Sequence, residues 1–240
     1  MNNQNLFRET FEFGETRGLI ITDEEDAITA AKESLRENRR KLEGYIRRNP
    51  KFLYSLKPVK VDNDSPKVAK LMAEASEKAG VGPMAAVAGV LADLAVEAML
   101  AKGARVALVE NGGEVSAVSD RPINVALSAG DHPLSKRVGF KLENFPVGIA
   151  TSSGVYSHAI SFGEAEAVTI FAENAGLADA VATAVGNIVI GDNPQKAVEN
   201  GARKALSVEG VRGTIIIYRG TVGIAGQIPK ILKIVPTMVY

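Results

Sequence analysis

The sequence predicts an α+β fold, in which a largely antiparallel sheet packs on buried helices rich in alanine and glycine. Strand-like segments occur in both halves of the chain and do not alternate strictly with helical ones, as they would in a parallel α/β fold. Two helical segments, residues 81–103 and 176–189, are apolar on most sides and must therefore be buried. Hydrophobic residues make up 46% and charged residues 23% of the chain, as in ordinary globular proteins.

The first sixty residues predict two strands and a long helix. Residues 6–22 contain two β-leaning runs, the first of which alternates apolar and polar side chains. Thr22 and Glu25 have the spacing of a capping box, so a helix is expected from there to about Asn49, where a proline prevents continuation. Residues 52–61 are expected to be a β-leaning connector.

The rest of the chain predicts further strands and helices. A helix over residues 65–80 has Ser65 as its expected N-cap, Pro66 at its first position and Gly80 as its stop signal. The tail from residue 213 is expected to form β-hairpin-like structure. Other strands are expected at residues 104–110, 114–119, 121–128, 139–144, 147–152 and 167–172, and a last helix at 193–208. No linker marks a boundary, so we expect a single domain over residues 1–240, with N-terminal elements in 1–60 and a core in 82–190.

Composition excludes several classes of function. Lys and Arg together number 28, as do Asp and Glu, which gives no overall electrostatic footprint for nucleic acid or an anionic membrane, although a local basic patch is compatible with it. The absence of cysteine excludes thiolate metal sites and thiol nucleophiles. The N-terminus lacks a secretory signal pattern, and the most apolar run carries Asp93 and Glu97. We therefore expect a cytoplasmic protein without nucleic-acid or membrane partners; homo-oligomerisation is left open.

Asp179 and Thr183 are the strongest candidates for a metal site. They lie four residues apart, on one face of a predicted apolar helix, and their oxygens suit a hard cation, Mg²⁺ foremost. Alternatively, Asp179 is a helix N-cap or an ion-pair partner, and Thr183 bonds to a backbone carbonyl. Asp93 and Glu97 repeat this spacing, so they require compensation by a cation, a basic side chain or hydrogen-bond donors, unless both lie on a solvated face.

Two other features could contact a ligand. His158, one of two histidines, is the best candidate acid or base near neutral pH, and a structural role is the alternative. Gly112 and Gly113 predict a tight corner with free N–H groups, suited to a phosphate or a flat ring. An ordinary hairpin turn would have the same sequence.

Four motifs occur in order and together resemble the ApbE-like superfamily. They are AGVLAD (88–93), NGGE (111–114), ATSSGVYSH (150–158) and ADAVAT (178–183). Characterised members of that superfamily are magnesium-dependent flavin transferases, which attach FMN from FAD to a Ser or Thr of a partner protein. The resemblance implies a T-fold-like architecture with the ligand site between the sheet and the small-residue helices.

The resemblance also assigns roles to particular residues. It implies Mg²⁺ and FAD or FMN as cofactors, a small-molecule ligand and a protein partner. His158 would be catalytic, and the metal would be held by Asp179 and Thr183, with Asp93 as a weaker candidate. The ligand-binding residues would be Gly89, Asn111, Gly112, Gly113, Glu114, Thr151, Ser152, Ser153 and Gly154.

The chain departs from the transferase pattern at three places. Ala88 stands where the transferases carry a lysine, Glu114 replaces an aspartate, and SFGEA (161–165) replaces an Asp-Pro and Thr-Gly element. The chain thus resembles a compact prokaryotic branch of the superfamily. We expect it to bind a flavin, nucleotide or related phosphorylated heterocycle without transferring FMN, and turnover of any kind is left open. The alternative is a non-catalytic accessory protein in sulfide assimilation or homocysteine biosynthesis.

Overall fold

The computed structural model describes residues 6–14, 16–126, 138–153 and 163–233, which form two antiparallel sheets. The main sheet has eight strands in the order β1-β2-β3-β4-β7-β8-β9-β10, and the small sheet has the order β11-β6-β5. The strands are β1 (Phe7–Phe13), β2 (Thr16–Thr22), β3 (Val106–Asn111), β4 (Glu114–Ser119), β5 (Ile123–Ala126), β6 (Val138–Leu142), β7 (Val147–Ser152), β8 (Ala167–Ala172), β9 (Val211–Tyr218), β10 (Thr221–Gly226) and β11 (Lys230–Lys233). The predicted α+β class with a largely antiparallel sheet is confirmed.

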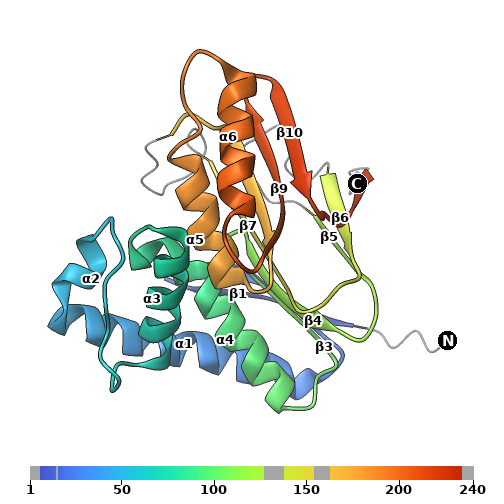
Figure 1. Cartoon of the computed structure of the whole chain (residues 1–240). Helices are drawn as coiled ribbons and strands as arrows, with labels where there is room; N and C mark the ends of the chain where they lie inside the picture. The colour runs from blue at the N-terminus through green and yellow to red at the C-terminus, as the bar shows by residue number, and fades with distance from the viewer. Residues whose placement is uncertain (1–5, 15, 127–137, 154–162, 234–240) are drawn as a thin grey trace.

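The helices cover one face of the main sheet, and the small sheet lies on the other side (Figure 1). The predicted helix over residues 81–103 forms as a 3₁₀ turn followed by an α-helix. The helices are α1 (Glu25–Arg48), α2 (Pro50–Tyr54), α3 (Lys67–Ala79), the 3₁₀ helix η1 (Pro83–Ala86), α4 (Val87–Ala101), α5 (Ala175–Gly186) and α6 (Pro194–Leu206).

Two hydrophobic cores follow from the alternation of side chains along the strands. The larger core lies between the helices and the main sheet and includes Met72, Met99 and Val109. The smaller core lies between the two sheets and includes Leu108 and Phe171. Neighbouring residues of one strand, such as Leu108 and Val109, therefore belong to different cores, and each strand position has a definite face.

Three local predictions were wrong. Thr22 and Glu25 form no capping box, because Thr22 is buried at the end of β2 and the helix begins after Glu24 without a side-chain cap. Helix α3 begins after Pro66, so Ser65 is not its N-cap, whereas Gly80 ends it in the left-handed conformation as predicted. The expected β-leaning connector at residues 52–61 begins inside the short helix α2.

Helices α4 and α5 cross in very close contact at two glycines. A Cβ on Gly89 would lie 2.2 Å from the Ala175 carbonyl oxygen, and one on Gly176 would lie 2.5 Å from Val90 Cγ2. The stretch Pro83–Ala101 has the length and apolarity of a membrane-spanning helix, but half of it is buried inside the protein. These small residues let the two helix backbones touch, and α4 is a core helix.

Candidate functional site

The α4–α5 crossing is closed by two aspartates that each bind the start of the other helix. On α4, Asp93 accepts hydrogen bonds from the backbone N–H groups of Ala175 (2.9 Å) and Gly176 (2.8 Å) in the first turn of α5. On α5, Asp179 accepts one from Gly89 N (3.1 Å) in the first turn of α4. Unpaired N–H groups at a helix start favour a negative charge, so each carboxylate stabilises the neighbouring helix. This is close to the capping role considered for Asp179, but it acts between two helices.

Glu114 brings a second carboxyl group toward Asp179. Burial raises its pKa well above the ordinary value, and the charges of Asp179 and Glu110 raise it further. Burial also raises the pKa of Asp179 to about 7, although N–H groups of Gly89 and Ala88 oppose the shift. Within the described part of the chain, no basic side chain forms an ion pair with Glu114 or Asp179. The two carboxyl groups therefore hold protons more tightly than exposed carboxyl groups do, and no described ammonium or guanidinium group is paired with them.

The turn between β3 and β4 is built by Gly112 and Gly113. Both have positive φ angles, +71° and +117°, as a two-residue turn with this strand pairing requires. The Gly112 N–H donates to the Arg17 carbonyl (3.0 Å), and the Gly113 N–H donates to the Glu110 carboxylate (2.7 Å). The prediction that these N–H groups are free for a phosphate is therefore wrong, because the protein itself binds them.

Asn111 on β3 and Ser116 on β4 connect the main sheet to the crossing of α4 and α5. Asn111 is 3% exposed, and its side-chain amide donates to the Ala88 carbonyl (2.9 Å) at the start of α4. Ser116 Oγ donates to Asp93 (2.6 Å). Sequence reasoning missed Ser116, although its alternation with Glu114 in EVSAVS places both on one face of β4.

The hydroxyl residues after Ala150 do not all reach this site. Ala150 packs in the core under the helices, so Thr151 points to the opposite face, where its hydroxyl bonds Thr169 (3.0 Å). Thr151 is thus on the wrong side of the sheet to contact Asp179. Ser152 has the helix-facing position, and Ser153 is buried beyond the strand end. Gly154 and His158 lie outside the described residues.

The donor set around Asp179 fits a cation that keeps most of its water. Thr183 follows Asp179 by one turn of α5 and is partly exposed. Among the described residues, no group of three His, Cys, Asp or Glu side chains is placed to hold a metal ion. Mg²⁺, however, is commonly held by one or two carboxylates together with water and substrate phosphates. Two carboxylates and a nearby hydroxyl fit that pattern.

A pocket of about 380 Å³ opens beside Glu114, and we call it the Arg17–Glu114 pocket. Its polar lining includes Arg17, Arg39 and Asn111. Arg39 is fixed by donating to the Phe13 carbonyl (2.6 Å), whereas Arg17 is exposed. The apolar lining comes from α1, η1 and α4 and comprises Leu42, Ile46, Met84, Val87, Ala88 and Leu91. No local pattern in the sequence indicated the two arginines.

These features define an α+β protein with the architecture of ApbE proteins. The structure matches the flavinyl transferase ApbE of Pseudomonas stutzeri with a TM-score of 0.60 at 14% identity, over 92% of this chain and 94% of that one. It matches the ApbE protein of Thermotoga maritima with a TM-score of 0.62 at 15% identity, over 92% and 97% of the two chains. At such identities the likeness concerns the fold.

The chain belongs to the family described as AbpE bacteria, whose model matches residues 2–221. A UPF0280 protein of Methanococcus vannielii is 39% identical over 232 residues, which are 95% of this chain and 94% of that protein. A UPF0280 protein of Methanothermobacter thermautotrophicus is 43% identical over 196 residues, which are 81% and 76% of the two chains. The predicted membership of an ApbE-like superfamily is confirmed.

The raised pKa values predict that stability falls between pH 5.5 and 8. Asp179 and Glu114 bind protons more tightly in the folded chain, so folding is favoured at low pH and this contribution is lost as the pH rises through their folded pKa values. We expect thermal denaturation in EDTA to give a melting temperature a few degrees lower at pH 8, and the Asp179→Asn variant to show a smaller decrease.

Glu37 provides the matched control for this pH dependence. Lys41 lowers the pKa of Glu37, so its contribution to stability is complete above the unfolded value of about 4.5 and does not change between pH 5.5 and 8. The Glu37→Gln variant should keep the pH dependence of the unmodified protein. A decrease of equal size in Asp179→Asn and Glu37→Gln would contradict the assignment.

Proposed function

We propose that this protein binds a flavin, a nucleotide or a related phosphorylated heterocycle together with Mg²⁺ at the Arg17–Glu114 pocket. The observation that carries the proposal is the pair of carboxyl groups of Glu114 and Asp179, which has no described ion-pair partner and of which Glu114 lines this pocket. A buried pair of like charges is costly unless protons or a cation compensate it. A divalent cation held by Glu114 and Asp179 would supply the compensating positive charge.

The rest of the pocket supports a ligand with a flat ring and an anionic group. Apolar side chains such as Ile46, Met84 and Leu91 provide a surface for a ring system. Arg17 provides an exposed guanidinium group, which can bind phosphate through several N–H donors, whereas Arg39 is paired with Glu43 (3.2 Å), which also lines the pocket. The apolar side chains of the helices would hold the ring, and Arg17 would bind the phosphate.

Asp179, Glu114 and Thr183 would hold Mg²⁺ in this proposal. The ion would neutralise phosphate charge, which is the chemistry it supplies in such sites. The protein's own contribution is positional, because Asn111 fixes the start of α4 and the glycine turn fixes Glu114. Turnover and FMN transfer are not part of the proposal, since Ala88 and Glu114 depart from the transferase pattern.

Thermal-shift measurements with Mg²⁺, FAD and ADP test this function. Mg²⁺ should raise the melting temperature by a few degrees, and FAD or ADP should raise it further only when Mg²⁺ is present. Asp179→Asn and Glu114→Gln should remove the Mg²⁺ response. Arg17→Gln should weaken the response to FAD or ADP and preserve the response to Mg²⁺ alone.

Glu77→Gln is the control, because Glu77 is an exposed carboxylate on α3 outside this pocket. It should respond like the unmodified protein. If neither Mg²⁺ nor any flavin or nucleotide moves the melting temperature of the unmodified protein, the proposal fails. The accessory role in sulfide assimilation or homocysteine biosynthesis stays a prediction from the resemblance.

A further inference from the structure

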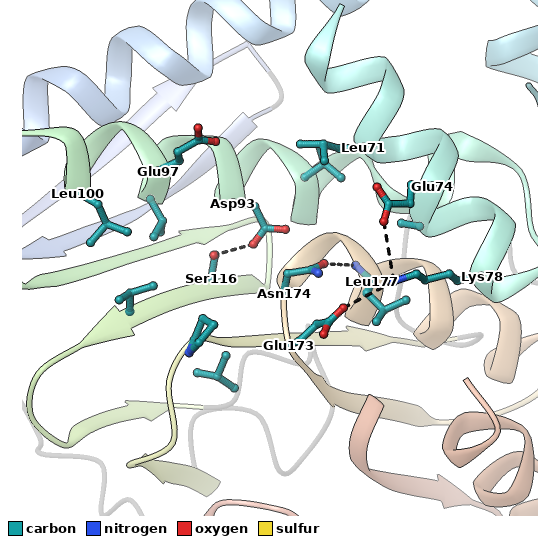
Figure 2. A pocket seen from close by; sticks show the side chains of 16 residues that line it. Leu71, Glu74, Lys78, Asp93, Glu97, Leu100, Ser116, Glu173, Asn174 and Leu177 are labelled. Atoms are coloured by element: carbon teal, nitrogen blue, oxygen red, sulfur yellow. Dashed lines mark hydrogen bonds and ion pairs between the residues drawn. The ribbon is translucent and has the colours of Figure 1, made fainter. Parts of the chain in front are cut away.

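A second pocket, of about 330 Å³, lies between α3, α4, β4 and the start of α5 (Figure 2). We call it the Asp93 pocket. It is separate from the Arg17–Glu114 pocket, because none of its lining residues lines the other one. Its volume is at the lower end of the range for small-molecule sites. Most of its lining is apolar and includes Leu71, Val96, Leu100, Val118, Val147 and Leu177.

The polar groups of the Asp93 pocket carry an excess of negative charge. Lys78, the one basic residue among the described residues that line the pocket, lies 3.8 Å from Glu74 and 3.6 Å from Glu173, so two carboxylates share one ammonium group. Asp93 adds a third carboxylate at the back of the pocket, where Ser116 binds it (Figure 2). Glu97 also belongs to the lining, but its charge is paired with Lys67.

Asp93 makes this charge a fixed feature of the pocket. Its carboxylate is held by Ser116 and by two backbone N–H groups at the start of α5, so it cannot turn away as an exposed side chain can. Glu74 and Glu173, by contrast, are 64% and 46% exposed and can adjust to a ligand at the entrance. A molecule that enters therefore meets apolar walls, a fixed acidic end and an adjustable acidic rim.

We propose that the Asp93 pocket binds a small organic cation with an apolar body, such as an aryl-alkyl amine. The apolar walls would cover the body, and the ammonium group would take the place of the missing positive charge beside Glu74 and Glu173. Anionic molecules of the same shape would be disfavoured by the net negative charge. This site does not depend on the flavin or nucleotide proposed for the Arg17–Glu114 pocket.

Three indole compounds of similar size test this inference: tryptamine, which is cationic, tryptophol, which is neutral, and indole-3-propionate, which is anionic. Backbone amide NMR shifts of the full chain would give each dissociation constant and show where each compound binds. Tryptamine should bind about two- to fivefold more tightly than tryptophol, as expected for partly exposed charge pairs, and indole-3-propionate should bind most weakly. The shifted amides should belong to residues that line the Asp93 pocket.

Variants distinguish the effect of the pocket's charge on binding from the effect of its shape. The double variant Glu74→Gln, Glu173→Gln leaves Lys78 unpaired and should remove or reverse the preference for tryptamine. Leu100 is 37% exposed on α4, so Leu100→Trp should fill the pocket without unfolding the chain. This variant should bind all three compounds more weakly. Glu77→Gln changes an exposed glutamate of α3 outside the pocket and should change nothing.

Three results would overturn the inference. The first is that none of the compounds shifts amides of the Asp93 pocket in the unmodified protein. The second is that indole-3-propionate binds as well as tryptamine. The third is that Leu100→Trp, shown to be folded by its NMR spectrum, binds tryptamine undiminished.

Discussion

Replacing Gly89 by alanine should destabilise the protein by about 3 kcal/mol or more, which lies at or above the upper end of the usual cost of overpacking. The new Cβ would lie 2.2 Å from the Ala175 carbonyl oxygen and 2.4 Å from its carbonyl carbon. These are backbone atoms of α5, which cannot rotate away as a side chain can, so α4 and α5 must separate. Urea denaturation would measure the loss, and the melting temperature should fall by about 6–12 °C.

The same substitution at Gly44 should have the opposite effect. Gly44 lies within α1, and a Cβ there would meet only the ends of Arg47 and Arg48, both at 3.9 Å. Alanine is favoured over glycine in a helix interior by about 0.5–1 kcal/mol, so Gly44→Ala should stabilise the chain. If Gly89→Ala were as stable as Gly44→Ala, the close crossing of α4 and α5 would be wrong.

Removing the Asp93 carboxylate should cost about 2–4 kcal/mol. Its oxygens accept from Ser116 Oγ, Ala175 N and Gly176 N, and in Asp93→Ala these donors lose their acceptor. Buried donors left without a partner cost about 1–3 kcal/mol each, less where water enters, as the adjoining pocket permits. Denaturant unfolding would measure the loss. The Asp93→Asn variant keeps one acceptor oxygen, so its free energy of unfolding should lie between those of Asp93→Ala and the unmodified protein.

Glu97→Ala is the matched control for Asp93. Glu97 lies one turn further along α4 but is exposed, and its partner is the exposed Lys67. Pairs of this kind contribute about 0.2–1 kcal/mol, so this variant should lose no more than that. Equal losses in the Asp93 and Glu97 variants would show that Asp93 does not hold the start of α5.

The fold was largely predictable from the sequence because hydrophobic periodicity reports which face of an element is buried. The strands ARVALVE and EVSAVS pair as expected, and the apolar helices are buried as expected. Helix starts were less predictable. Thr22 is of a residue type that often caps helices, but it is the last residue of β2 and is fully buried. Which neighbour a short polar side chain binds depends on tertiary packing, which spacing alone does not contain.

Several residues of the candidate site could be predicted from the sequence, but the hydrogen bonds that join them could not. The sequence shows that Asp93 and Asp179 need compensation, but the N–H groups that provide it lie more than 80 residues away along the chain. Alternation along β7 would have placed Thr151 on the face away from the helices. Arg17 and Arg39 reach the pocket from β2 and α1, where nothing in the local sequence distinguishes them from solvated residues.

The hydrogen bonds by which Asp93 and Asp179 each bind the start of the other helix have a consequence for synthesis on the ribosome. The backbone N–H donors for Asp93 are encoded 82 and 83 positions after it, whereas the third donor, Ser116, lies 23 positions after it. A nascent chain that ends before α5 therefore contains one of the three hydrogen-bond donors of Asp93, the hydroxyl of Ser116, and lacks the two N–H groups. The hydrogen bonds of Asp93 are complete only when the start of α5 has been translated, so α4 should not reach its full stability against the sheet before then.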